Sequence, residues 1–231
     1  PCDSVWGPMH WGHAVSTDLL SWTHLPIALA PDALGMCFSG TAAVDYGDKS
    51  GLFDGKDGLL AYYTIAAEKR PDDVDFPQSQ GLAYSHDNGR HWTKYSGNPV
   101  IANPGLQDFR DPKVFWHSPS QHWIMVVTTG QQVSIYRSTD AKNWQFSSSF
   151  GDGHGAHDER AWECPDLFCL KDTNGEEHWV FWSADGYYYF GTFDGYTFCW
   201  DGVRHQAYMN QIPYAAQTIS GITDRIISIP W

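Results

Sequence analysis

The sequence predicts an all-β fold, a five-bladed β-propeller whose N-terminal blade is only partly present. Short β-rich runs dominate the 231 residues, and helical periodicity is hard to find. A turn pattern recurs along the chain, and 22 Gly and 13 Pro residues supply frequent breaks. Sets of strands repeat together with this turn, as propeller blades do. The chain is long enough to bury a core, so we expect one propeller domain over residues 1–231.

The recurring turn runs from a strand through Ser-x-Asp and closes on an aromatic residue. Ser and Asp side chains bond nearby backbone N–H groups, and Asn or Gly takes the tight positions. We therefore expect these segments to serve turn formation and packing, without a catalytic role. The copies are AVSTDLLSW (14–22), AYSHDNGRHW (83–92) and IYRSTDAKNW (135–144), with a looser copy in YFGTFDGYTF (189–198).

The predicted strands form three complete sets, each with a first strand, a middle strand and an outer hairpin. The first strands lie in FSGTAAVD (38–45), FRDPKVFWH (109–117) and WECPDLFCL (162–170). The opening HWGHAVSTDLLSW (10–22) is interpreted as the end of an earlier blade. YAAQTIS (214–220) and RIISIPW (225–231) are interpreted as the beginning of a later one. Three complete and two partial blades give the five-bladed ring.

The charge balance excludes some classes of partner. Lys and Arg number 14 and Asp and Glu number 27, so the net charge is −13. Nucleic acids and anionic membrane surfaces need clustered Lys and Arg, and we expect neither as a partner. Neutral sugars remain possible partners. The 12 Trp, 12 Tyr and 12 Phe residues offer aromatic rings on which the faces of sugars can stack. The five cysteines form no C-x-x-C pair, and no nucleotide or metal motif is found, so we expect no cofactor and no metal.

Polar residues open the first strand of each set, and these strands line the central channel of a propeller. Arg110 and Asp111 share one strand, Pro112 interrupts its ladder, and Glu163 opens the next. Two carboxylates on neighbouring blades suit glycoside chemistry, in which one group protonates the leaving oxygen. A purely structural salt bridge through Arg110 explains the same residues equally well. Phe38, Ser39 and Gln217 are expected in the same funnel.

At the level of motifs, the chain resembles glycoside hydrolase family 32, the invertase, inulinase and levanase group. The matching stretches are WGPMHWGHAVSTDLLSWTHLPIALAPD (6–32), FSGTAAV (38–44), FRDPKVFWH (109–117), ECPDLF (163–168) and YAAQT (214–218). The resemblance implies a five-bladed propeller, usually followed by a β-sandwich. It also implies hydrolysis of β-fructosides such as sucrose, inulin or levan, with retention through a covalent fructosyl-enzyme.

The resemblance also implies roles for individual residues. Glu163 corresponds to the general acid/base, and Asp111 to the transition-state stabiliser. Arg110 is expected to contact the sugar and orient the carboxylates. Trp6 is expected to contact the fructosyl unit. The same subsite is expected to include Phe38 and Ser39.

Some features of the family are missing from the sequence. The family nucleophile is the aspartate of a W-M-N-D-P-N-G motif, and this sequence has no such motif. The C-terminal β-sandwich is also absent, so we expect an incomplete chain that does not form the covalent intermediate as it stands. Extracellular location is implied by the resemblance alone. A non-catalytic sugar-binding propeller and an arabinanase-like inverting hydrolase remain as alternatives.

Overall fold

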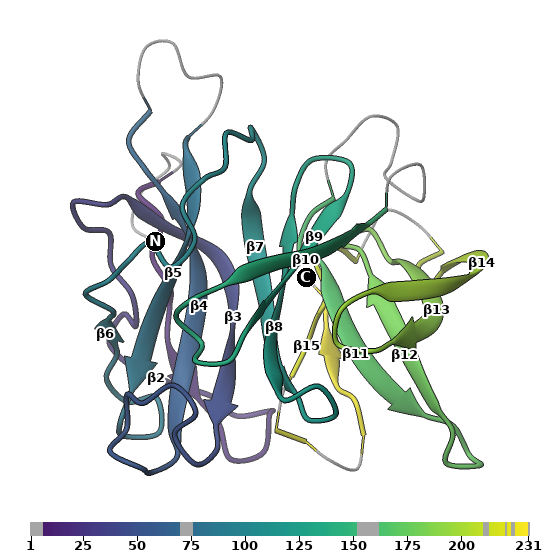
Figure 1. Ribbon diagram of the computed structural model, residues 1–231. Helices are drawn as coiled ribbons and strands as arrows, with labels where there is room; N and C mark the ends of the chain where they lie inside the picture. The colour runs from purple at the N-terminus through teal and green to yellow at the C-terminus, as the bar shows by residue number, and fades with distance from the viewer. Residues whose placement is uncertain are drawn as a thin grey trace.

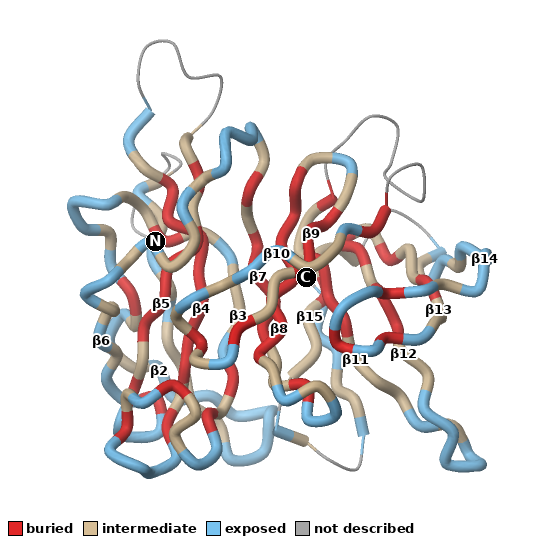
Figure 2. Tube along the Cα trace, viewed as in Figure 1, coloured by how far each residue is buried: buried red, intermediate tan, exposed pale blue. Residues whose placement is uncertain are grey.

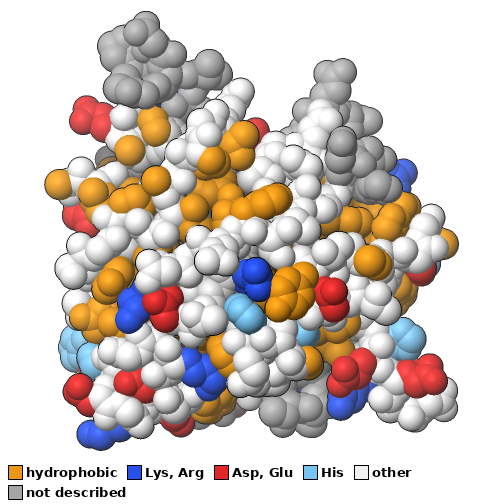
Figure 3. Space-filling view, in the orientation of Figure 1, with side chains coloured by type: hydrophobic (Ala, Val, Ile, Leu, Met, Phe, Trp, Pro, Cys, Tyr) orange, Lys and Arg blue, Asp and Glu red, His pale blue; other side chains and the backbone are white. Residues whose placement is uncertain are grey.

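The computed structural model describes residues 7–69, 76–151, 162–209, 213–219, 221–222 and 225–230. These residues form five antiparallel sheets and contain no helix (Figure 1). No helix suited to crossing a membrane is therefore present in this part of the chain. The face seen in Figure 3 carries charged side chains of both signs, scattered among apolar atoms without a basic patch.

Three sheets have four strands each, paired in chain order as expected for propeller blades. The first contains β3 (Met36–Asp45), β4 (Gly58–Ala66), β5 (Gln78–Ser85) and β6 (Thr93–Lys94). The second contains β7 (Arg110–His117), β8 (His122–Thr128), β9 (Val133–Ser138) and β10 (Gln145–Phe150). The third contains β11 (Asp166–Lys171), β12 (Glu177–Trp182), β13 (Tyr187–Phe193) and β14 (Phe198–Gln206).

Two shorter sheets flank these blades in the sequence. One pairs β1 (Ala14–Val15) with β2 (Thr23–His24), and the other pairs β15 (Gln217–Thr218) with β16 (Ser228–Ile229). The expectation of three complete and two partial blades is confirmed. The fold is therefore an incomplete five-bladed β-propeller.

The position of the middle strand β8 explains why its sequence is one continuous apolar run. Side chains alternate between the two faces of a strand. Trp123, Met125 and Val127 belong to the core shared with the β3–β6 blade. Ile124 and Val126 belong to the core shared with the β11–β14 blade. Both faces of β8 are therefore buried between neighbouring blades. Figure 2 shows this burial as the red colour at β8.

The Ser-x-Asp turns have the structural role predicted for them. In the turn after β9, Ser138 Oγ donates to Asp140 Oδ1 at 3.0 Å, and the Asn143 backbone N–H donates to the same oxygen at 2.8 Å. Ala141 within this turn is fully buried, and its carbonyl accepts from the Tyr62 hydroxyl of the preceding blade at 2.7 Å. The turn thus joins two blades as well as two strands.

Replacing Asp140 is expected to loosen this junction between blades. Asp140→Ala should lower the free energy of unfolding by about 1 kcal/mol at neutral pH, because several donors lose their acceptor. Burial raises the pKa of Asp140, but hydrogen bonds, chiefly from Asn143, outweigh it and lower the pKa to about 2. Asp140 ionises less readily when unfolded, so its contribution is complete above pH 4 or so and is lost as pH falls toward 2.

Thermal unfolding of both proteins across this pH range tests the prediction. The difference in melting temperature should shrink as pH falls toward 2. Asp201→Ala is the matched control, because Asp201 accepts from the Val203 N–H at 2.8 Å on an exposed part of strand β14. Equal losses in the two variants would contradict the role of the junction.

Candidate active site

Two first strands carry bulges at the point where the polar motifs lie. The ladder between β7 and β8 shifts register between Arg110 and Lys113, so Asp111 and Pro112 fall inside the bulge. Pro112 can occupy this place because no ladder hydrogen bond needs its missing N–H. The ladder between β3 and β4 shifts similarly between Cys37 and Gly40. Bulges re-aim side chains, which explains how a charged pair interrupts an otherwise buried strand.

The bulge of β7 is tied to the neighbouring blade by Thr41 on β3. The Thr41 hydroxyl donates to the Pro112 carbonyl at 2.9 Å and accepts from the Val114 N–H at 3.0 Å. The Asp111 N–H donates to Thr64 Oγ1 on β4 at 2.8 Å. The position of Asp111 is therefore fixed by two strands of another blade.

Three of the nine described non-glycine residues with a positive φ lie around one pocket between the first strands. Asp111, Cys164 and Ala215 have φ angles of 61°, 42° and 54°, in the left-handed region that non-glycine residues rarely adopt. All three line a pocket of about 280 Å³, together with Ser39, Thr41 and Gln217. Such strain persists where the surroundings impose it, and it clusters at functional sites.

Asp111 is the more deeply buried of the two predicted carboxyl groups, with its side chain 8% exposed. Its Oδ2 accepts from the Cys164 N–H at 3.0 Å and lies 3.8 Å from Arg110 Nε. Burial raises the pKa of Asp111, and the charge of Glu163 adds to this. The Cys164 N–H and Arg110 offset only part of the effect, so the pKa stays above the usual value.

Glu163 has a more open environment, with its side chain 40% exposed. Its Oε1 lies 3.4 Å from Arg110 Nη2, and its Oε2 accepts a hydrogen bond from the Tyr214 hydroxyl. Arg110 therefore contacts both carboxyl groups, and it also pairs with Asp108. Two carboxyl groups in such different environments suit two different chemical roles.

The structure brings most of the predicted site residues together. Asp111 and Ser39 line the pocket, and Arg110 links Asp111 to Glu163. Phe38 lies in an adjoining pocket of about 320 Å³, which Ser39 also lines. Trp6 lies outside the described residues. The ion pairs required by the purely structural interpretation are present too, so the pocket and the strain are what favour a functional site.

Three further residues support the site without having been predicted to do so. Tyr214 bonds Glu163, Thr64 bonds Asp111, and Trp11 Nε1 donates to the Phe38 carbonyl at 2.8 Å. Tyr214 lies shortly before β15, the first strand of the last blade. Arg110 and Glu163 have similar positions at the starts of β7 and β11. That shared position was the available signal. Thr64 lies in the middle of an apolar strand, where the sequence gives no signal.

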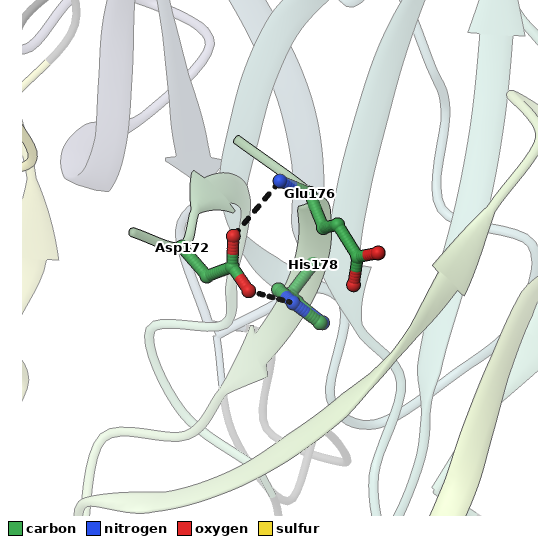
Figure 4. Close-up of side chains that lie close together, drawn as sticks. All are labelled: Asp172, Glu176 and His178. Carbon is green, nitrogen blue, oxygen red and sulfur yellow. Dashed lines mark hydrogen bonds and ion pairs between the residues drawn. The ribbon is translucent and has the colours of Figure 1, made fainter. Parts of the chain in front are cut away.

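Among the described residues, one group has the composition of a metal site. Asp172, Glu176 and His178 lie together on the β11–β12 hairpin (Figure 4). The Asp172 carboxylate already accepts from the Asn174 and Glu176 N–H groups at 2.8 and 2.9 Å, so it closes the turn. The hairpin is at the end of β11 away from Glu163. This group therefore takes no part in the pocket described above.

The fold and the paired carboxyl groups define a β-propeller of the glycosidase type. The model for the glycosyl hydrolases family 32 N-terminal domain matches residues 1–231. This chain belongs to glycoside hydrolase family 32, as its motifs indicated.

Individual relatives agree with this assignment. The chain is 48% identical over 211 residues to a levanase of Bacillus subtilis (strain 168), covering 86% of the chain and 30% of the levanase. It is 38% identical over 227 residues to the extracellular exo-inulinase of Aspergillus niger, covering 84% of the chain and 42% of that protein.

A solved structure shows the same architecture. The fructofuranosidase from Schwanniomyces occidentalis complexed with fructose matches with a TM-score of 0.88 at 34% identity, over 100% of this chain and 47% of that one. The chain thus spans less than half the length of these three relatives.

Proposed function

We propose that the protein containing this chain hydrolyses β-D-fructofuranosidic bonds in sucrose or fructans with retention of configuration. Residues 1–231 form its propeller catalytic domain in this proposal. The observation that carries it is the pair of carboxyl groups, Asp111 and Glu163, held by one guanidinium beside a strained pocket. The relatives named levanase and exo-inulinase support the choice of substrate class.

Glu163 is assigned the role of general acid/base. Its exposed carboxyl group can reach a leaving oxygen, while Tyr214 and Arg110 hold its two oxygens in place. In the first step it would donate a proton to the departing sugar, and in the second it would remove a proton from water. We assign the attacking carboxylate to no residue of this sequence, which has no W-M-N-D-P-N-G motif.

Asp111 is assigned the role of transition-state stabiliser. A buried carboxylate that is already positioned interacts strongly with positive charge developing on the fructosyl ring. Its oxygens can also accept hydrogen bonds from fructose hydroxyls. Arg110, Trp6, Phe38 and Ser39 are assigned to sugar binding.

We also infer that the protein acts outside the cell. The name of the Aspergillus niger relative, extracellular exo-inulinase, supports this location.

The test uses the protein at its full gene length, incubated with sucrose, inulin and levan, with maltose as the control substrate. NMR spectra taken early should show β-fructofuranose as the first product from at least one fructoside and no reaction of maltose. The α-anomer as first product would favour an inverting, arabinanase-like enzyme. Binding of fructans in calorimetry without any turnover would favour a non-catalytic module. Either result would overturn the proposal.

A further inference from the structure

A buried polar cluster joins the first strands of three consecutive blades. Lys113 lies on β7, Asp166 on β11 and Thr218 on β15. Lys113 and Asp166 have side chains only 7% and 1% exposed. A buried charge is costly unless it is paired and hydrogen-bonded. The partners of Lys113 and Asp166 therefore decide whether the cluster can be buried without a large loss of stability.

The three side chains contact one another directly. Lys113 Nζ lies 2.9 Å from Asp166 Oδ1, and it donates to the Thr218 hydroxyl at 2.8 Å and to the Thr218 carbonyl at 3.1 Å. The ammonium group thus has two hydrogen-bond acceptors on Thr218 and an ion pair with Asp166, whose Oδ1 accepts no hydrogen bond from the described residues. The N–H and the hydroxyl of Thr218 each donate to Asp166 Oδ2 at 2.7 Å.

Each member of the cluster stands just beyond a strained residue of the pocket. Asp111 precedes Lys113 across the bulge, Cys164 precedes Asp166, and Ala215 precedes Thr218. A left-handed backbone at a non-glycine residue relaxes unless the segment is held on both sides. The cluster provides that hold on the downstream side of all three segments at once.

We propose that Lys113, Asp166 and Thr218 are positioning residues that fix the placement of Asp111 relative to Glu163. This positioning role rests on the function proposed above. The cluster holds three strand starts in register, so that Arg110 and Tyr214 meet the carboxyl groups. Loss of one hydrogen bond in the cluster lets the three strand starts move relative to one another. Even a small movement of Asp111 relative to Glu163 disturbs the alignment of the catalytic groups with the substrate.

The test compares Thr218→Val with Thr218→Ser in the protein at its full gene length. Valine keeps the shape and backbone of threonine but removes the hydroxyl, whereas serine keeps it. Thr218→Val should lower kcat by about 10- to 100-fold, with a smaller change in KM. Thr218→Ser should stay close to the wild type.

Lys142→Met is the matched control for a purely structural effect. Lys142 Nζ also donates across a blade junction, to the Ser50 carbonyl, away from the pocket. This variant should lower the melting temperature without changing kcat or KM at a temperature where every variant is folded. Equal kcat in Thr218→Val and the wild type, or equal losses in Thr218→Val and Thr218→Ser, would overturn the proposal.

A second readout does not depend on turnover. Alkylation of Cys164 by N-ethylmaleimide, followed by mass spectrometry of its peptide, reports how firmly the strained segment is held. The rate should rise several-fold in Thr218→Val and stay unchanged in Thr218→Ser and Lys142→Met. An unchanged rate in Thr218→Val would refute the positioning role. If the wild type releases no fructose, the proposed function fails, while this measurement still decides the role of the cluster.

Discussion

Glu163→Gln is expected to lower kcat for fructose release by about 10²- to 10⁴-fold, the usual contribution of a general acid/base. Glutamine has the same shape and can still accept the hydrogen bond from Tyr214, but it cannot transfer a proton to the leaving oxygen. The measurement is initial-rate kinetics on sucrose and on inulin with the protein at its full gene length.

Two comparisons sharpen this prediction. A β-fructoside with an aryl leaving group needs less proton assistance and should lose less activity than sucrose. Glu177→Gln is the matched control, because Glu177 on β12 is 57% exposed and pairs with Lys171 at 3.3 Å. Its kinetics should be unchanged. Turnover of sucrose by Glu163→Gln at the wild-type rate would end the assignment of Glu163.

Asp111→Asn is expected to lower kcat by about 10²- to 10³-fold, as the loss of one preorganised electrostatic group usually does. Asparagine keeps the size of the side chain but removes the negative charge that stabilises the positive charge developing on the fructosyl ring. Because burial raises the pKa of Asp111, the acid limb of kcat/KM in the wild type should lie above pH 3.8. That limb should change in the variant.

The same pKa shift predicts that Asp111→Asn remains stable. A carboxyl group whose pKa is raised by folding costs stability once it is ionised, at pH values above its folded pKa. Removing this charge should therefore leave the melting temperature at neutral pH unchanged or higher. Asp45→Asn is the contrasting control, because the buried Asp45 carboxylate accepts from the Lys49 and Ser50 N–H groups at 2.9 Å each. It should lose stability and keep kcat, and the opposite pattern would contradict both assignments.

The blades were predictable because their signals are local. The apolar run of β8 follows from burial on both faces, and the Ser-x-Asp turns close over a few residues. The bulge at Asp111 was indicated by Pro112. The polar residues at the starts of the first strands made Asp111 and Glu163 candidates, and the family motifs then suggested their roles, which stay predictions.

The remaining parts of the site depend on contacts between distant segments. Thr64 reaches Asp111 across 47 residues, Tyr214 reaches Glu163 across 51, and Lys113 reaches Thr218 across 105. A threonine inside a strand and a tyrosine before one have many structural uses. Their roles became visible only when the first strands were placed side by side.

The turn at Asp140 and the cluster at Lys113 imply an order of assembly. Hairpins closed by Ser-x-Asp turns join residues near in sequence, and such elements form within microseconds. The cluster joins segments more than a hundred residues apart, so its closure carries the entropy of a long loop. A nascent molecule would then complete its blades before it completes its pocket, and the proposed activity would be the last property acquired during folding.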